Sequence, residues 1–429
     1  MAAPRCAAPT AGTGRFQPKS RKEKPRMPLF RAKGLPAAGS LSSRVAAAGG
    51  TLVATSAGPL ANDATIAFVA GIGMTLQNIV APVARALSAY PVRRVAVVGR
   101  GSVVPDLYQD FDEVYEVAPF RRAGPASTAA ALVGLRRIVR RERVDLLHLH
   151  SPFGIALGRA VGVMTGTPHV AVVSGTLFDS PTRAGRLFSA IEATTARLTP
   201  TYITVNPEDR ESYRRLAPRS RVSVAPCGAA GIDPERFTVT RTPSGAPNRP
   251  RRLLLMGRLT KDKNLDLAVA AWRLARRALP EIELRIVGST APGEPAWTPP
   301  VECGLTVEAW TRHPAAELAA ADVVLSASPR EGFPMVLVEA LTVGTPVVAV
   351  SNRGTRALAQ QVEEGLTLVP PDAALMAEAL LRRLDGPPVR VARAVLDSWS
   401  LASVSAFHAE QILRHLREAQ ERTLVMQHT

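Results

Sequence analysis

The sequence contains little cysteine. Only three of its 429 residues are cysteines, Cys6, Cys227 and Cys303, and none of them forms the closely spaced pair that zinc sites use. An odd number of scattered thiols also does not build a disulfide framework. The cysteine content therefore argues against both a disulfide scaffold and a zinc site, and it fits a reducing cytosol.

Long apolar runs are also missing. No uninterrupted apolar stretch reaches the length of about 18 residues that a membrane-spanning helix needs. Hydrophobic residues nevertheless make up 46% of the chain and charged residues 21%, which is enough apolar material to fill folded cores. We therefore predict a folded cytoplasmic protein whose contact with a membrane, if it has one, is peripheral at the inner face.

Acidic residues are nearly absent from the first part of the chain. Residues 1–60 hold ten lysines and arginines but a single acid, Glu23, within a chain of net charge +17. This stretch is rich in alanine, proline, glycine and serine and has no apolar periodicity, so residues 1–62 are predicted to form a disordered basic tail. An unfolded extension, or a start site placed too far upstream, is the favoured interpretation. A transit peptide or a contact with an anionic membrane stays open, and no nucleic-acid partner is expected.

Apolar runs alternate with helical segments from about residue 64 onward. Strands alternating with helices of this length predict βαβ units and a parallel sheet covered on both faces. The strands expected in this first half are Ala64–Ala70, Val92–Val98, Val144–His148, Thr167–Val173, Thr201–Val205 and Arg221–Ala225. The helices expected between them include Thr75–Ala89, Ala126–Arg141 and Arg183–Leu198.

A segment rich in proline, glycine, serine and arginine, residues 238–251, then interrupts the alternation and predicts a linker. The pattern restarts with strands at Arg252–Met256, Ile282–Val287, Leu305–Val307, Val323–Ser326 and Thr345–Val350, and helices at Asn264–Leu279 and Leu401–Arg422. The predicted fold is α/β, with two doubly wound Rossmann-like domains, residues 63–237 and 252–400, facing each other across a cleft, and a closing helix in residues 401–429. The ligand is expected at the carboxyl ends of the strands.

Two cations follow the first strand of the second half. In the stretch MGRLTKDKN, Gly257 lets the backbone turn and Arg258 and Lys263 leave the strand end five residues apart. A guanidinium and an ammonium at the mouth of a cleft suit a diphosphate. The alternative is that both are solvated loop charges that pair with Asp262 or Asp266.

Two glutamates lie in the otherwise apolar stretch PREGFPMVLVEALTVGTPVVAV. Pro334 fits the first position of a helix, which predicts a helix start near Phe333, with Glu331 in the preceding loop and Glu339 in the second turn. The free N–H groups around Gly332 and Phe333, with the positive end of the helix dipole, predict an anion site. Carboxylates on either side of it can accept hydrogen bonds from sugar hydroxyls, and Glu339 would be costly to bury without partners.

The stretches GRLTKDKNLD and REGFPMVLVEALTVGTPVVA resemble the donor-binding half of the family 4 glycosyltransferases, which are retaining enzymes of the GT-B type. Glu331 and Glu339 match the E-x7-E motif of that family. The resemblance implies that Glu339 holds the ribose hydroxyls of a nucleotide sugar and Glu331 its sugar ring. It also implies that Arg258 and Lys263 bind the diphosphate.

The first half extends this resemblance, which spans roughly residues 64–420. FDEVYEV (Phe111–Val117), DLLHLHSP (Asp145–Pro152) and TVNPED (Thr204–Asp209) are similar to the branch that builds exopolysaccharide, capsule and lipid-linked glycans. NRGTR (Asn352–Arg356) is similar to that branch's R-G-N-R loop, with Thr355 in place of the asparagine. The resemblance implies a hexosyl or other glycosyltransferase that uses a nucleotide-diphosphate sugar and a glycan or lipid-linked acceptor.

Further site candidates lie in the first half. Gly71 and Gly73 resemble the family's glycine loop under the diphosphate, with Thr75 as a helix cap. His150 is expected in the cleft, and His148, on the same face of its strand, in the core. Two roles are open for Asn206: it binds substrate, or it caps the helix that follows it.

The sequence departs from the family pattern at two places. Ser174 stands where the branch carries a strand-end histidine, which puts catalytic competence or sugar choice in doubt. The segment after Gly288 is short and proline-rich, which leaves the choice of nucleotide base open.

Retaining glycosyl transfer without a cofactor or an essential metal is therefore the leading hypothesis. A nucleotide-sugar epimerase or hydrolase of the same architecture, or a catalytically impaired nucleotide-sugar-binding protein, is the alternative. The triplet Asp110-Phe-Asp112 spells the D-x-D of metal-dependent glycosyltransferases, but it lies away from any strong strand end.

Overall fold

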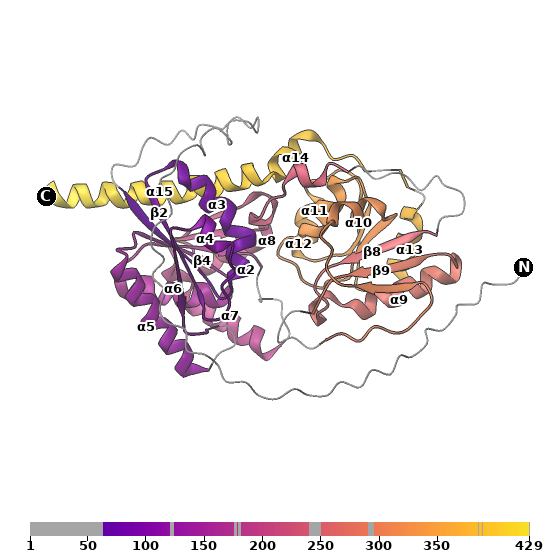
Figure 1. The fold of residues 1–429 in the computed structure, drawn as a ribbon, viewed down its shortest axis with the longest axis horizontal. Coiled ribbons are helices and arrows are strands. Elements are labelled where there is room, and N and C mark those ends of the chain that lie inside the picture. Colours follow the sequence, from indigo (N-terminus) through magenta and orange to yellow (C-terminus); the bar gives the residue numbers. More distant parts are fainter. Residues whose placement is uncertain are drawn as a thin grey trace, which may run out of the picture. The chain divides into compact units, whose positions relative to one another are not determined.

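The computed structural model describes residues 63–120, 124–175, 178, 182–239, 250–290, 296–384, 386–387 and 389–428. The predicted tail and most of the predicted linker therefore lie outside the described residues. Within the described part, two parallel sheets are present, one of seven strands in the order β3-β2-β1-β4-β5-β6-β7 and one of six in the order β10-β9-β8-β11-β12-β13 (Figure 1). The predicted α/β class with two doubly wound sheets is confirmed.

The first sheet is built from the first half of the chain. Its strands are β1 (Ala64–Ala70), β2 (Val92–Gly99), β3 (Glu113–Val117), β4 (Leu146–His150), β5 (His169–Val173), β6 (Thr201–Thr204) and β7 (Arg221–Val224). Its helices are α2 (Gly73–Thr75), α3 (Ala81–Ala86), α4 (Leu107–Asp110), α5 (Pro125–Arg141), α6 (Pro152–Thr165), α7 (Arg183–Thr195) and α8 (Pro207–Leu216). Alternate residues of β1 enter two cores on opposite faces of the sheet, so both faces are covered.

The second sheet repeats the plan. Its strands are β8 (Arg252–Met256), β9 (Glu283–Val287), β10 (Leu305–Glu308), β11 (Val323–Ser326), β12 (Val347–Val350) and β13 (Leu366–Val369). Its helices are α9 (Leu265–Ala278), α10 (Pro314–Ala320), α11 (Met335–Thr342), α12 (Arg353–Ala359), α13 (Ala373–Leu384) and α14 (Arg393–Trp399). Short 3-10 turns lie at Leu87–Ala89, Ala196–Leu198, Pro226–Ala229, Pro234–Phe237 and Lys261–Lys263.

The closing helix α15 (Leu401–His428) packs against the first half, although it follows the second half in sequence. Ile412, Leu413 and Leu416 lie in the same core as Ile66 and Phe68 of β1. The chain therefore crosses back after α14, and the last helix completes one face of the first sheet.

The helix predicted over Thr75–Ala89 is interrupted. Thr75 is not its cap, since α2 already begins at Gly73 with Ile72 in the cap position. A π turn at Leu76–Val80 separates α2 from α3, and Pro82 lies in the first turn of α3. Because proline has no N–H to donate one turn back, the regular hydrogen-bond ladder cannot run through this point, and the wider turn takes its place.

Candidate donor-binding site

The carboxyl end of β8 meets the carboxyl end of β9 very closely. The Gly257 N–H donates to the Val287 carbonyl at 3.0 Å. A Cβ added at Gly288 would lie 1.8 Å from the Gly257 carbonyl oxygen, so only glycine fits there. This contact fixes the backbone from which Arg258 and Lys263 depart.

A cavity of about 270 Å³ opens at this edge of the second sheet, between the ends of β8 and β11 and the start of α11. The residues that line it include Gly257, Arg258, Lys263, Ser328, Glu331 and Phe333. The structure thus brings Arg258, Lys263, Glu331 and Phe333, all predicted from sequence, to one place. Polar groups that converge on a concave site are the usual mark of a ligand pocket.

Lys263 and Glu331 form an ion pair across the cavity. The Nζ of Lys263 donates to Oε1 of Glu331 at 2.5 Å, and both side chains are mostly buried. This pair links two loops that are 68 residues apart in the sequence and orients both side chains before any ligand binds. Arg258 is half exposed and pairs with Asp262 at 3.0 Å, which is one of the two pairings considered as the alternative.

The loop before α11 keeps its backbone donors available. Helix α11 begins at Met335, and Pro334 is its cap. The prediction that Pro334 occupies the first helical position is therefore wrong by one residue. Its non-helical ψ of 85° makes Pro334 the point at which the helix starts. Among the described residues, the N–H groups of Gly332 and Phe333 donate to no acceptor. They therefore remain available to an anion at the positive end of the helix dipole.

Glu339 lies in the second turn of α11, as predicted, but it is not among the residues that line the cavity. Burial raises the pKa of its carboxyl to about 7, against a smaller lowering effect of Arg236. Burial raises the pKa of the neighbouring Cys227 thiol to about 12, and the negative charge of Glu339 acts in the same direction. Glu339 is half-buried by surface exposure, and a ligand that supplies hydroxyl donors would compensate for the burial of its carboxylate.

The two predicted glycines of the first half are held by close backbone contacts. The Gly73 N–H donates to the Ser102 carbonyl at 3.0 Å, and a Cβ at Gly73 would lie 2.3 Å from that oxygen. The Gly71 N–H lies 3.4 Å from Oγ of Ser151. Both glycines therefore serve a tight turn after β1, and their predicted role under a diphosphate stays a prediction.

Ser174 lines a second cavity, of about 210 Å³, at the ends of β4 and β5. Its carbonyl oxygen would lie 2.0 Å from a Cβ added at Gly332, so the end of β5 touches the loop before α11. Residues that share this cavity are Thr75, Ser151, Gly175, Phe188 and Tyr213, among others.

His150 lies away from both cavities. It is buried between β4 and α15, where its Nε2 lies 2.8 Å from Nδ1 of His148, and the ring of His408 lies 5.8 Å from that of His148. Burial lowers the pKa of His150 to about 3, so the ring is neutral. The prediction that both histidines share one face is confirmed, but in this structure His150 is a core residue like His148.

Asn206 caps α8. Its side-chain oxygen accepts from the Asp209 N–H at 2.7 Å. Its Nδ2 donates to Oδ2 of Asp209 at 2.8 Å and to the Gly332 carbonyl at 3.0 Å. The capping alternative is confirmed, and the amide has no donor left for a substrate.

The carboxylates of the D-x-D triplet are held by arginines. Asp110 pairs with Arg85 at 2.9 Å, and Asp112 pairs with Arg94 at 2.8 Å. Both acids therefore serve ion pairs, Asp110 between α4 and α3 and Asp112 near the starts of β2 and β3.

Two protein-family models match the chain. One, described as Glycosyltransferase Family 4, matches residues 78–236, and the other, described as Glycosyl transferases group 1, matches residues 250–385. The chain belongs to the family 4 glycosyltransferases. It is a glycosyltransferase of GT-B fold, and the resemblance stated from the motifs is confirmed.

Curated relatives of this glycosyltransferase agree. The UDP-Gal:alpha-D-GlcNAc-diphosphoundecaprenol alpha-1,3-galactosyltransferase of Escherichia coli is 25% identical over 274 residues, which is 59% of this chain and 70% of that protein. The amylovoran biosynthesis glycosyltransferase AmsK of Erwinia amylovora is 30% identical over 208 residues, 43% of this chain and 49% of that protein.

Solved structures show the same fold. Anabaena Alr3699/HepE in complex with UDP and glucose has a TM-score of 0.58 at 17% identity and covers 85% of this chain and 100% of its own. The lipopolysaccharide outer core galactosyltransferase WaaB has a TM-score of 0.58 at 13% identity and covers 80% and 98%.

Proposed function

We propose that this glycosyltransferase moves a sugar from a nucleotide-diphosphate sugar to a glycan or lipid-linked acceptor, with retention of configuration and without an essential metal, in the cytoplasm. The observation that carries the proposal is the cavity at the ends of β8 and β11, where Lys263, Glu331 and Phe333 converge. Gly332 lies between Glu331 and Phe333, and neither its N–H nor that of Phe333 donates to an acceptor among the described residues. The Escherichia coli relative named above uses UDP-galactose and a diphosphoundecaprenol-linked sugar, which favours a uridine nucleotide and a lipid-linked acceptor in polysaccharide synthesis.

The chemistry follows from where charge develops. As the bond from the sugar to the diphosphate breaks, negative charge grows on the phosphate oxygens. The Lys263 ammonium, the Arg258 guanidinium and the two backbone N–H groups stabilise that charge more in the transition state than in the ground state. Glu331, held by Lys263, accepts hydrogen bonds from the sugar ring. Glu339 accepts them from the ribose.

The test is a turnover screen of the full chain over UDP-sugars and other nucleotide sugars, with lipid-linked and free glycan acceptors. Nuclear magnetic resonance reads the anomeric configuration of the product. We expect acceptor-dependent transfer with retention. Donor conversion without any acceptor would instead favour an epimerase or a hydrolase. If the wild-type chain binds nucleotide without turnover and Ser174→His restores turnover, the lack of activity is due to Ser174.

A peripheral contact with an anionic membrane is part of the proposal, and the outer face of α5, α6 and α7 supports it. Phe153 and Met164 project from one face of α6 with 44% and 45% of their surface exposed, and Val163 beside them with 52%. The only acid in these three helices, Glu192, is buried on Arg159 at 2.7 Å. Their exposed basic residues are Arg136, Arg137, Arg140, Arg141, Arg183 and Arg186.

An exposed face of apolar side chains and arginines fits a negatively charged lipid surface, although Arg141 at the end of α5 pairs with Glu142. It does not fit a second copy of the same face, because the arginines would repel one another. Among the described helices, none combines the length and apolar character needed to cross a bilayer.

Co-sedimentation of the full chain with vesicles tests this face. We expect binding to phosphatidylcholine vesicles that contain phosphatidylglycerol, and little binding to phosphatidylcholine alone. Arg136→Gln with Arg137→Gln should weaken it at least about tenfold, since each arginine near an anionic surface contributes about 1 kcal/mol. Phe153→Gln with Met164→Gln should weaken it too, whereas Leu375→Gln, a control on α13 with 44% exposure, should not. Unchanged binding of both double variants would move the contact elsewhere, for example to the basic tail.

A further inference from the structure

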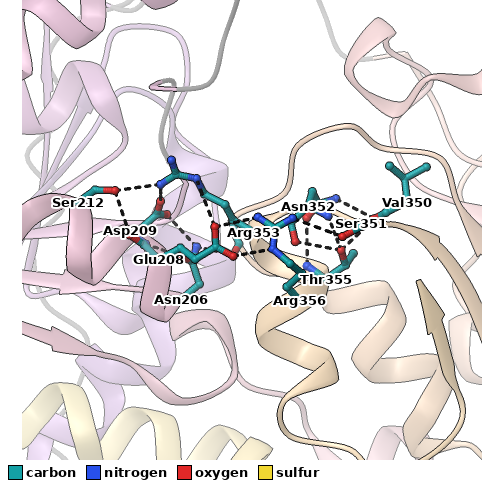
Figure 2. A network of polar contacts seen from close by, with 11 residues as sticks. Asn206, Glu208, Asp209, Ser212, Val350, Ser351, Asn352, Arg353, Thr355 and Arg356 are labelled. Atoms are coloured by element: carbon teal, nitrogen blue, oxygen red, sulfur yellow. Dashed lines mark hydrogen bonds and ion pairs between the residues drawn. The ribbon is translucent and has the colours of Figure 1, made fainter. Parts of the chain in front are cut away.

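Polar side chains of α8 and α12 join the two halves of the chain (Figure 2). Nη1 of Arg353, the first residue of α12, donates to Oδ1 of Asp209 at 2.9 Å and to Oγ of Ser212 at 3.1 Å. Arg356, the fourth residue of α12, grips both carboxylate oxygens of Glu208 at 2.7 and 2.8 Å. The contacts connect positions more than 140 residues apart in the sequence.

The two helices differ in what they gain from these charges. Glu208 and Asp209 lie in the first turn of α8, where the helix dipole favours acids. Arg353 lies in the first turn of α12, where the dipole disfavours a cation. Helix α12 therefore gains nothing by itself from Arg353, and the residue is explained by its partner on α8.

The two ion pairs, Arg353–Asp209 and Arg356–Glu208, contribute unequally to the stability of the contact between α8 and α12. Arg356 and Glu208 are each more than two-fifths exposed, and exposed pairs add little. Asp209 is only 1% exposed and Arg353 20%, so this bond is shielded from water. Removing Arg353 would leave a buried carboxylate short of a charged donor, which costs far more than the loss of a surface pair.

The Arg353–Asp209 bond closes a ring around the loop that carries Glu331. Asn206, which binds Asp209, also donates to the Gly332 carbonyl at 3.0 Å. From the other side, the Gly354 N–H donates to the Glu331 carbonyl at 3.1 Å. A Cβ at Gly354 would lie 2.8 Å from that oxygen, so the contact is tight.

We propose that Arg353 and Asp209 are positioning residues for sugar transfer. Their bond holds the first turn of α8 against the first turn of α12 and thereby fixes the Glu331 loop over the donor cavity. Neither residue lines that cavity, so they act through Gly332 and Glu331. The inference rests on the proposed function, because it takes Glu331 as the group that faces the donor sugar.

The test is the steady-state kinetics of the full chain with its best donor and acceptor. We expect Arg353→Ala and Asp209→Asn each to lower kcat about tenfold, while the Kd of the free nucleoside diphosphate rises less than about threefold, because Lys263 and Arg258 remain in place and only the contacts from the N–H groups of Gly332 and Phe333 are disturbed. The double variant should lose little more than either single variant, because both single variants remove the same bond between Arg353 and Asp209. Arg353→Lys should recover most of kcat. Arg393→Ala on α14, which breaks an exposed pair, is the matched control and should change neither quantity.

Each outcome decides the matter. Wild-type kcat in both single variants would overturn the positioning role. A loss of nucleotide affinity as large as the loss in kcat would also overturn it, since that indicates a general disturbance of the fold. If Arg353→Ala does not fold, Asp209→Asn gives the same comparison, and Arg353→Lys remains the conservative variant that should keep most of kcat. A wild-type chain that turns over no donor at all would overturn the proposed function instead.

Discussion

Replacing Lys263 with alanine is expected to lower kcat of sugar transfer by about a hundredfold to a thousandfold. This is the usual effect of removing one preorganised hydrogen-bond donor from a site where negative charge develops. Lys263 projects into the cavity at the end of β8 and is already oriented by Glu331 at 2.5 Å, so the site need not reorganise as charge appears on the diphosphate. The change also releases Glu331 from its ion pair with Lys263, which adds to the loss.

Lys261→Ala is the matched control for Lys263→Ala. Lys261 belongs to the same short turn but is exposed and does not line the cavity, so its removal should change kcat less than about twofold. Single-turnover measurements with saturating donor separate the chemical step from binding. Equal kcat values for the two lysine variants would contradict the assignment of the diphosphate to this cavity.

Glu339→Ala is expected to weaken binding of the nucleoside diphosphate at pH 8 by about a hundredfold, equivalent to about 3 kcal/mol, because two ribose hydroxyls lose a charged acceptor. The pH dependence gives a sharper signature. Burial raises the pKa of the carboxyl to about 7 in the free chain, and hydroxyl donors favour its ionised form. Affinity should therefore fall as the pH drops below about 7, with uptake of a proton by free Glu339.

Calorimetric titrations in buffers of different ionisation enthalpy measure this coupling. The wild-type chain should release a proton on binding near pH 6, and Glu339→Gln should bind weakly with no such release. The same raised pKa makes the free energy of unfolding larger at low pH, whereas nucleotide affinity is larger at high pH. Its contribution is full below the unfolded value of 4.5 and is lost as the pH rises through about 7. Binding of the nucleotide by Glu339→Ala with wild-type affinity would refute the ribose assignment.

Much of the fold could be predicted because buried parallel strands are nearly continuous apolar runs. Ala64–Ala70 and Val323–Ser326 were predicted at their observed bounds for that reason. The edge strand β3 (EVYEV) carries two exposed glutamates, and three of the four residues of β13 are only partly buried, so neither was predicted as a strand. The return of α15 to the first half depends on tertiary packing of Ile412 and its neighbours, which local periodicity does not encode.

The site was predictable where residue type and strand end coincide. Arg258, Lys263 and Glu331 were found in this way, but their pairing was not, because it depends on how two distant loops approach each other. The same reason applies to Arg353, whose partner Asp209 lies 144 residues away. A sequence signal did exist, since an arginine in the first turn of a helix opposes its dipole.

The most direct test of the whole account is the crystal structure of the chain with a bound nucleoside diphosphate. The account predicts diphosphate oxygens within hydrogen-bond distance of Nζ of Lys263 and of the N–H groups of Gly332 and Phe333, with the ribose hydroxyls on Glu339. A nucleotide seated instead in the cavity beside Ser174, with Lys263 and Glu339 untouched, would contradict it.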